Sequence, residues 1–387
     1  NTYPDQCIVK GSIFGCNNLN GTPLGNVTVH IYKTWGTART ETGNLESIDN
    51  TKHKYHLAAV YGGGNLAAYV PTLNDAFAHV IIDGCDLTSI RQVYGGGNAA
   101  SVPATQVDVY GTYEIDELFG GGNGFGTIEK NGATITNPGA NVGFRDYWDY
   151  DNEKDLDAYD TKEERLTNET FLRDYVYGSG RASVNIYGGL VHAVFGGSNT
   201  RGNVRVTAVT LLQDLEGCHF LVDEAYGGGK SAAMDAEARL LMSCIPGLKV
   251  AYGGAEAADV QGGVTLSITN GTFDRVFGGN NISGTISGPI VVNIQETGCR
   301  PIIIGQLYGG GNQAPYSAPD VDGVRQPGPT VNVYSFTSIG EIYGGGYGNT
   351  AVVTGDTYVN VNTFERKYYQ TNQNGQDNVL QEEDKTI

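Results

Sequence analysis

The chain has 387 residues, of which 57 are glycine, about twice the usual share of roughly 7%. Because hydrophobic residues reach 40% and aromatic residues 10%, the composition excludes a disordered glycine-rich polymer. A formal net charge of −18 repels phosphates and argues against a nucleic-acid partner, and no apolar run of about 18 residues predicts insertion into a membrane.

Short alternating runs recur along the chain. In each, apolar and often β-branched residues occupy every second position, which is typical of a half-buried strand. The clearest runs are Val27–Tyr32, Gln106–Gly111, Ser183–Gly188, Val264–Gly271, Ile290–Gln295, Thr330–Ser335 and Thr357–Asn362. Four of the runs hold an asparagine between apolar residues, and we expect its side chain to point outward: Asn185, Asn293, Asn332 and Asn360.

An aromatic residue followed by two glycines closes each repeating unit. The residue directly before the aromatic residue and the residue four positions before it are always apolar. The nine full copies have their aromatic residue at Tyr61, Tyr94, Phe119, Phe195, Tyr226, Tyr252, Phe277, Tyr308 and Tyr343. Six copies carry asparagine four residues after the ring, and Phe14 and Tyr177 mark two degenerate copies.

The spacing of the units predicts the fold. Tyr94 and Phe119 lie 25 residues apart, which is too short for a propeller blade of about 40–45 residues but accommodates two or three short strands with their corners. We therefore predict an all-β protein, a right-handed parallel β-helix (solenoid) of about 9–11 coils with inserted loops. Residues 1–362 form a single domain with an insertion at about 124–182. Residues 363–387 form a polar tail or the start of a following segment.

Stacking explains the composition of the corner. Equivalent residues of successive coils lie about 4.8 Å apart, so the rings are expected to form a column. The glycines that follow can take a positive φ and admit a close-packed backbone, and the asparagines can link their side-chain amides along the stack.

Cysteines follow the same repeat. Four of the six lie eight or nine residues before a repeat aromatic: Cys85, Cys218, Cys244 and Cys299. One interpretation is a small buried side chain at a tight turn. The alternative is disulfides between neighbouring coils, with Cys218–Cys244 as the best candidate and Cys7–Cys16 as a second pair across the first turn.

The longest departure from the repeat contains the one strongly charged segment, Arg145–Leu166. Inserted loops of solenoids often carry binding. A calcium site needs six to eight oxygen ligands, and the alternating acids here are candidate ligands, although a solvated acidic loop is the simpler interpretation: Asp149, Asp151, Glu153 and Asp155. Aromatic residues of the inserted loops are candidates for stacking on sugar rings, with packing onto the solenoid as the alternative: Trp35, Tyr147, Trp148 and Tyr150.

Catalytic machinery is not recognisable in the regular units. Glycoside hydrolysis requires two carboxyl groups roughly 5–10 Å apart, and Asp108 is the one acid found on the strands that align cleanly. No catalytic residue is therefore predicted, and no cofactor other than calcium is considered.

The motif apolar-x-x-apolar-aromatic-Gly-Gly-Gly-Asn occurs in full at Ile90–Asn98. It resembles the coils of bacterial surface β-helix proteins, and is similar above all to the YGGGN-repeat proteins of gut Bacteroidota. This resemblance covers about residues 7–362 apart from the insertion. It implies an extracellular or cell-surface adhesin or glycan-binding scaffold without catalytic activity, whose partner is a host or microbial glycan or a surface protein. A start at Asn1 fits a cleaved signal or an excised domain. The alternative is a polysaccharide lyase or hydrolase that uses acids of the inserted loops.

Overall fold

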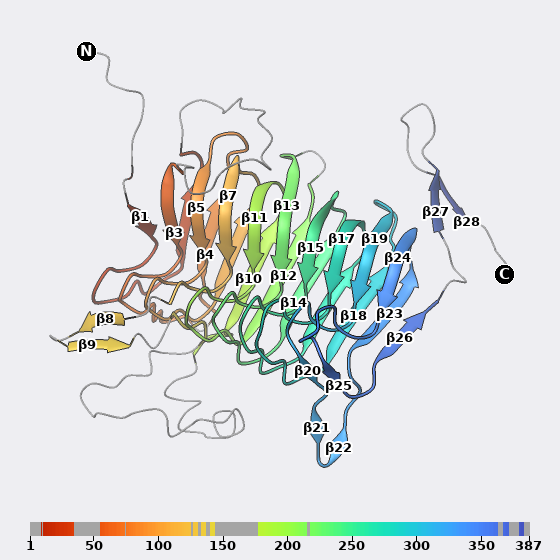
Figure 1. The fold of residues 1–387 in the computed structure, drawn as a ribbon. Coiled ribbons are helices and arrows are strands. Elements are labelled where there is room, and N and C mark those ends of the chain that lie inside the picture. The colour runs from red at the N-terminus through yellow and green to blue at the C-terminus, as the bar shows by residue number, and fades with distance from the viewer. Residues whose placement is uncertain are drawn as a thin grey trace.

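The computed structural model describes residues 9, 11–34, 55–73, 75–124, 127–130, 133–136, 140–143, 177–214, 217–362, 367–370 and 379–382. Within these ranges every helix or strand element is a β-strand, so the described fold is all-β as predicted. Most strands belong to two parallel sheets of ten strands each, which we call sheet A and sheet B (Figure 1).

Sheet A contains every strand that ends in a repeat aromatic residue. In spatial order its strands are β1 (Ser12–Phe14), β3 (Leu57–Tyr61), β5 (Ser89–Tyr94), β7 (Glu114–Phe119), β11 (Gly189–Phe195), β13 (Phe220–Tyr226), β15 (Gly247–Tyr252), β17 (Gly271–Phe277), β19 (Ile302–Tyr308) and β24 (Ser338–Tyr343).

Sheet B contains the alternating runs. Its strands are β2 (Val27–Ile31), β4 (Ala78–Ile82), β6 (Thr105–Val109), β10 (Arg181–Ile186), β12 (Val206–Leu212), β14 (Ala238–Ser243), β16 (Val264–Ile268), β18 (Ile290–Gln295), β23 (Thr330–Ser335) and β26 (Tyr358–Val361). Two-stranded pairs complete the set, namely β8 (Thr127–Lys130) with β9 (Ala133–Thr136), β20 (Tyr316–Ser317) with β25 (Val353–Thr354), β21 (Asp320–Val321) with β22 (Val324–Arg325), and β27 (Lys367–Gln370) with β28 (Val379–Glu382).

The chain passes from a strand of sheet B to the next strand of sheet A and then back, and we call each such passage a coil. Strands that follow one another in either sheet therefore come from successive coils and pair in parallel, as β5 does with β3 and β7. Isolated parallel bridges, such as Val102–Val142 and Val142–Val204, link the coils along a third side. This arrangement is consistent with a parallel β-helix.

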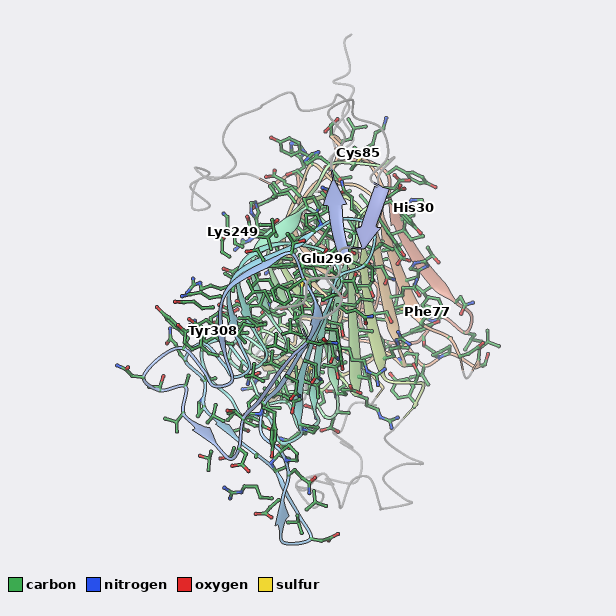
Figure 2. The ribbon with its side chains drawn as sticks, turned by 90° about the vertical axis from the view of Figure 1, so that its right-hand side faces the viewer. His30, Phe77, Cys85, Lys249, Glu296 and Tyr308 are labelled. Carbon is green, nitrogen blue, oxygen red and sulfur yellow. A yellow bond between two sulfur atoms is a disulfide. The ribbon has the colours of Figure 1, made fainter. Side chains whose placement is uncertain are left out.

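The two sheets enclose one apolar interior. Strands of sheet B alternate, so that Ala78, Val80 and Ile82 of β4 are fully buried while His79 and Ile81 between them are partly exposed. Viewed along the row of strands, Lys249 and Tyr308 of sheet A lie on one side of the molecule, and His30 and Phe77 on the other (Figure 2). The outer faces of the two sheets are thus separate surfaces.

Sheet A departs from strict alternation at one point in each strand. In β5 the apolar residues Ile90 and Val93 are buried, but both Arg91 and Gln92 between them are accessible. The register with β3 correspondingly skips the residue after Ile90. This extra outward residue places Tyr94 on the outer side of the sheet, because Val93 next to it points inward.

The aromatic residues form one continuous column on that outer side. Ten rings, from Phe14 to Tyr343, stack with neighbouring centroids 4.7–5.1 Å apart and planes within 11° of parallel. The column is a hydrophobic cluster distinct from the main interior. Phe119 stacks directly on Phe195, so the degenerate copy at Tyr177 does not contribute a ring.

The glycines after each ring are required by close approach of the neighbouring coil. A Cβ on Gly227 would lie 2.2 Å from the carbonyl oxygen of Gly253, and a Cβ on Gly253 would lie 2.4 Å from that of Gly278. None of these three residues has a positive φ. The expectation of left-handed backbone at this corner is therefore wrong, whereas the expected tight packing is present.

Asparagines extend the same order to the polar rim of the column. The amide of Asn98 donates to Asn65 at 2.8 Å, and Asn123 donates to Asn98 at 2.8 Å. The Tyr94 hydroxyl donates to Asn123 at 3.2 Å, so the ladder also satisfies a buried phenol. Each asparagine thus links two neighbouring coils.

Two disulfides connect turns between sheets B and A, but not in the predicted pairing. Cys218 is bonded to Cys85, and Cys244 is bonded to Cys299. Each bond passes over at least one intervening turn, so the expected Cys218–Cys244 bridge between adjacent coils is wrong. The physical reason is the small turn between the partners: a Cβ on Gly111 would lie 2.2 Å from the Cys218 sulfur, so its absence leaves room for the bond.

Of the second predicted pair, Cys7–Cys16, the structure describes Cys16. Cys16 carries a free thiol that contacts the carbonyl oxygen of Gly62 at 3.6 Å, and burial raises its pKa to about 12. Cys7 lies outside the described residues.

We expect Gly279→Ala to lower the free energy of unfolding by about 1–3 kcal/mol, since its Cβ would meet the backbone nitrogen of Gly311 at 2.8 Å. Gly345→Ala is the matched control, because it occupies the same position of the repeat yet meets nothing nearer than Val353 at 4.0 Å. Urea unfolding of both variants tests this; equal losses would contradict the close-approach explanation.

We also expect the double variant Cys85→Ser/Cys218→Ser to lose stability. The bond closes a loop of 133 residues, for which chain entropy gives an upper value of about 5 kcal/mol. Urea unfolding should show a large drop in the midpoint, while Cys16→Ser, which removes a free thiol and keeps both disulfides, should respond to reductant as wild type does. An unchanged midpoint in the double variant would refute the stabilising role.

Candidate functional site

The outer face of sheet A carries a row of charged side chains of alternating sign. The paired strands place Arg91, Asp116, His192, Asp223, Lys249 and Asp274 next to one another in that order. These are the first of the two outward residues in each strand. Each inner member therefore lies between two oppositely charged or titratable side chains, and His192, Asp223 and Lys249 form ion pairs.

His192 lies at the centre of this row. Its Nδ1 lies 2.7 Å from Asp223 Oδ2, and the other carboxylate oxygen of Asp223 lies 3.2 Å from Lys249 Nζ. His192 Nε2 is buried and has no hydrogen-bond partner among the described residues. A carboxylate that orients one ring nitrogen of a histidine, while the other ring nitrogen has no partner, is an arrangement also found in histidines that transfer protons.

Two carboxyl groups of the row, those of Asp116 and Asp223, have pKa values shifted in opposite directions. Burial raises the pKa of Asp116, and the neighbouring Glu117 raises it further. Burial would also raise the pKa of Asp223, but hydrogen bonds from His192 and Lys249 outweigh it and hold this pKa below its usual value. The hydrogen bond with Asp223 raises the pKa of His192 in turn.

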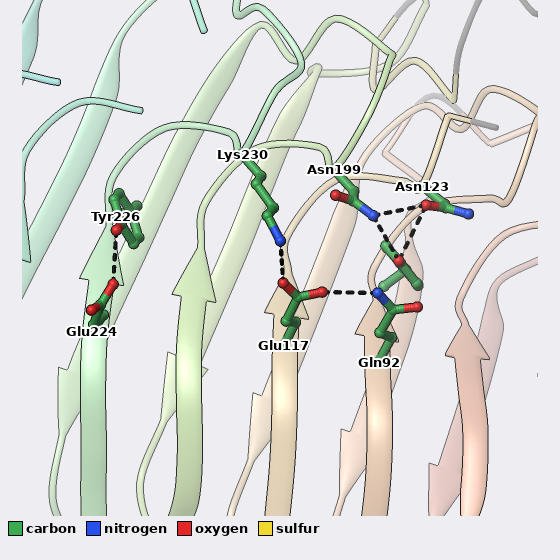
Figure 3. Close-up of polar contacts among 8 residues, drawn as sticks. Gln92, Glu117, Asn123, Asn199, Glu224, Tyr226 and Lys230 are labelled. Atoms are coloured by element: carbon green, nitrogen blue, oxygen red, sulfur yellow. Dashed lines mark hydrogen bonds and ion pairs between the residues drawn. The ribbon is translucent and has the colours of Figure 1, made fainter. Parts of the chain in front are cut away.

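A second polar network follows the neighbouring outward position (Figure 3). The Lys230 ammonium forms an ion pair with Glu117 Oε1, and Gln92 donates to Glu117 Oε2 at 2.8 Å. Lys230 occupies the asparagine position of its coil and reaches past β11 to β7. It can do so because the intervening residue, Ala193, is small and pairs with Glu117.

Tyr226 is buried and contacts Glu224, which lies in line with Glu117 across the strands. Its hydroxyl donates to Glu224 at 2.8 Å and accepts from Asn281 at 2.9 Å. Burial and the nearby Glu224 carboxylate raise the pKa of Tyr226 above its usual range. The acids of this second row are thus occupied by local partners.

The outer face of sheet B has a different character. Asp108, whose side chain is 5% exposed, lies 2.6 Å from His79 Nε2 and accepts from Gln106 at 2.7 Å and Asn185 at 2.7 Å. Further along the sheet, Asn332 donates to Asn293 at 3.1 Å. The predicted outward strand asparagines therefore form hydrogen-bonded rows on this face.

Exposed aromatic residues lie beside these polar rows. Tyr110 and Tyr187, which directly follow β6 and β10, stack with centroids 5.1 Å apart and planes 10° from parallel. Tyr32 follows β2 at the corresponding position, and its ring lies 3.8 Å from that of His30. Both Tyr32 and Tyr110 are exposed, at 64% and 48% respectively.

The sequence-predicted ligand and metal residues cannot be placed in this arrangement. They all lie outside the described residues: Trp35, Tyr147, Trp148, Asp149, Tyr150, Asp151, Glu153 and Asp155. Across the part of the chain that the structure describes, no cluster of three or more His, Cys, Asp or Glu side chains is suited to a metal ion. The calcium hypothesis for the inserted segment stays a prediction.

The charged row of sheet A escaped the sequence analysis, in which Asp108 was the one outward acid of the regular strands. The signal was present in the two residues between the apolar positions of the motif, such as Asp116 with Glu117 and Asp223 with Glu224. Strict alternation assigns one of each pair to the interior. The irregularity of sheet A turns both outward, which period-two reasoning cannot anticipate.

Comparisons with protein-family models, curated proteins and solved structures found no match. No helix in the described ranges has the length and apolar character needed to cross a membrane.

We expect the stability that His192 contributes to depend on pH. Because its pKa is raised on folding, the contribution is fully present below the unfolded pKa of about 6.5 and is lost as pH rises through the folded value. The difference in unfolding free energy between wild type and His192→Gln should therefore shrink from pH 6 to pH 9. The difference between wild type and Asp223→Asn, which removes the partner of His192, should shrink over the same pH range. A difference that stays constant with pH would contradict this.

Proposed function

We propose that this protein is an extracellular or cell-surface scaffold that binds glycans, with an adhesive rather than a catalytic role. Its architecture, on this proposal, is a right-handed parallel β-helix of about nine to eleven coils. Two ten-stranded parallel sheets support the proposal, as does the right-handedness of nearly all parallel crossover connections.

An extracellular location is supported by the disulfides. Two bonds join turns that lie far apart in the sequence, and disulfides persist in oxidising compartments. The acidic net charge of −18 is compatible with a neutral ligand and unfavourable for a polyanion.

The observation that carries the binding function is the outer face of sheet B. It combines hydrogen-bonded polar side chains around Asp108 with the adjacent exposed rings of Tyr32 and Tyr110. Polar groups that match hydroxyls, next to aromatic faces that match C–H groups, are the chemistry by which proteins bind sugars. Because these side chains are fixed by neighbouring coils, little conformational entropy is lost on binding.

One observation favours a second candidate, a polysaccharide-cleaving enzyme. Asp116, His192 and Asp223 are adjacent on the outer face of sheet A, and the environments of the two carboxyl groups shift their pKa values in opposite directions. Such a separation is typical of acid–base pairs. This candidate places catalysis on a sheet rather than in the inserted loops.

A glycan array followed by a reducing-sugar assay tests both functions. We expect the full chain to bind at least one class of glycan on the array and to release no reducing ends from that glycan. Turnover that is abolished by Asp116→Asn and by His192→Gln, with the unfolding midpoint preserved, would replace the scaffold by the enzyme.

A further inference from the structure

Four residues continue the ladder of sheet B just beyond its strands, and their side chains form a row. The backbone amide of Asp83 donates to Ile31 at 2.9 Å, that of Tyr110 to Ile82 at 3.0 Å, and that of Tyr187 to Val109 at 2.8 Å. Tyr32 begins the row. In spatial order its members are Tyr32, Asp83, Tyr110 and Tyr187, and we call them the aromatic row.

The side chains of the aromatic row point away from the interior. Each member follows an inward residue that is at most 8% exposed: Ile31, Ile82, Val109 and Ile186. By alternation the row itself faces outward. The exposures of Tyr32 and Tyr110, together with the 56% exposure of the Asp83 side chain, leave rings and carboxylate accessible to a ligand.

The spacing of the row matters for what it can hold. Tyr110 and Tyr187 belong to adjacent coils and stack on each other, whereas Tyr32 and Tyr110 are two strand spacings apart, about 9.6 Å. The coil between them contributes Asp83, which offers hydrogen-bond acceptors rather than a ring. Two aromatic side chains therefore flank one carboxylate along the direction in which the coils stack.

Rigid surroundings fix the row. Gly111 and Gly188, which directly follow Tyr110 and Tyr187, lie under the Cys85–Cys218 bond: their Cβ positions would be 2.2 Å and 2.9 Å from atoms of Cys218. The disulfide therefore packs against the segments that present the two stacked rings. Asp108, two residues before Tyr110, is held by three hydrogen-bonding neighbours.

We propose that the aromatic row and the adjacent Asp108–Asn185 pair bind a neutral polysaccharide that lies along the stacking direction of the coils. This assignment rests on the proposed glycan-binding function and specifies its place and ligand class. Pyranose C–H groups contact the exposed parts of the Tyr32 and Tyr110 rings, while Asp83 accepts hydrogen bonds from hydroxyl groups. The Asp83 carboxylate and the acidic net charge repel anionic sugars.

The experiment measures binding of the full chain to β-glucan, galactomannan, α-mannan and starch by affinity electrophoresis and calorimetry. We expect Tyr110→Ala to weaken binding of the retained polysaccharide at least tenfold and Tyr32→Ala/Tyr110→Ala to abolish it. Tyr110→Phe should retain most of it, because the exposed part of the ring remains.

Tyr334→Ala is the matched control. Tyr334 belongs to β23 near the other end of sheet B and is 47% exposed, as Tyr110 is 48% exposed. This variant should bind as wild type does, and thermal unfolding should show that all variants are folded.

The outcomes separate the two proposals. Undiminished binding by Tyr32→Ala/Tyr110→Ala would overturn the aromatic row as the site while leaving glycan binding intact. Failure of wild type to bind any polysaccharide on the array or in the panel would overturn both. Binding of the polycation spermine that depends on the row, without polysaccharide binding, would overturn the sugar assignment in favour of cation–π recognition.

Discussion

The structure depends on parallel backbone pairing between successive coils in one register. Once Ile90 pairs with Ile115 and Ile115 with Val191, every other position of those strands is also superimposed at the strand spacing of about 4.8 Å. Residues at equivalent positions of the repeat then meet one another. Rings stack on rings, amides donate to amides, and the same small residue is required in coil after coil.

This constraint explains why glycine is so abundant. The corner after each ring brings carbonyl oxygens of the next coil within 2.2–2.5 Å of where a Cβ would stand, as at Gly120 and Gly227. Any larger residue would separate two coils locally and misalign the ladder on both sides. The entropic cost of glycine is offset because one exact repeat spacing serves the ring column, the asparagine ladder and both sheets at once.

Because equivalent residues of successive coils are aligned, side chains on the outer faces of the two sheets form rows. On sheet A, a second outward residue in each strand allows charges of alternating sign to neutralise each other, as between His192, Asp223 and Lys249. On sheet B, polar and aromatic residues lie side by side, and a disulfide packs against the glycines that follow Tyr110 and Tyr187. A flat surface of fixed side chains is suited to an extended ligand, which is the basis for proposing a polysaccharide.

The sequence by itself determined the all-β class, the parallel stacking of the units and the identity of the ring column, because hydrophobic period and a fixed spacing between motifs are local properties of the chain. It could not determine which cysteines pair. Cys85 bonds to Cys218 across intervening turns whose small residues leave room, and the distance between turns of different coils is set only when the coils are stacked. Nor could it reveal the charged row through Asp116 and His192, since a local irregularity of sheet A decides which side chains face outward. The aromatic row likewise exists only in three dimensions, because Tyr32 and Tyr110 become neighbours through the pairing of β2, β4 and β6.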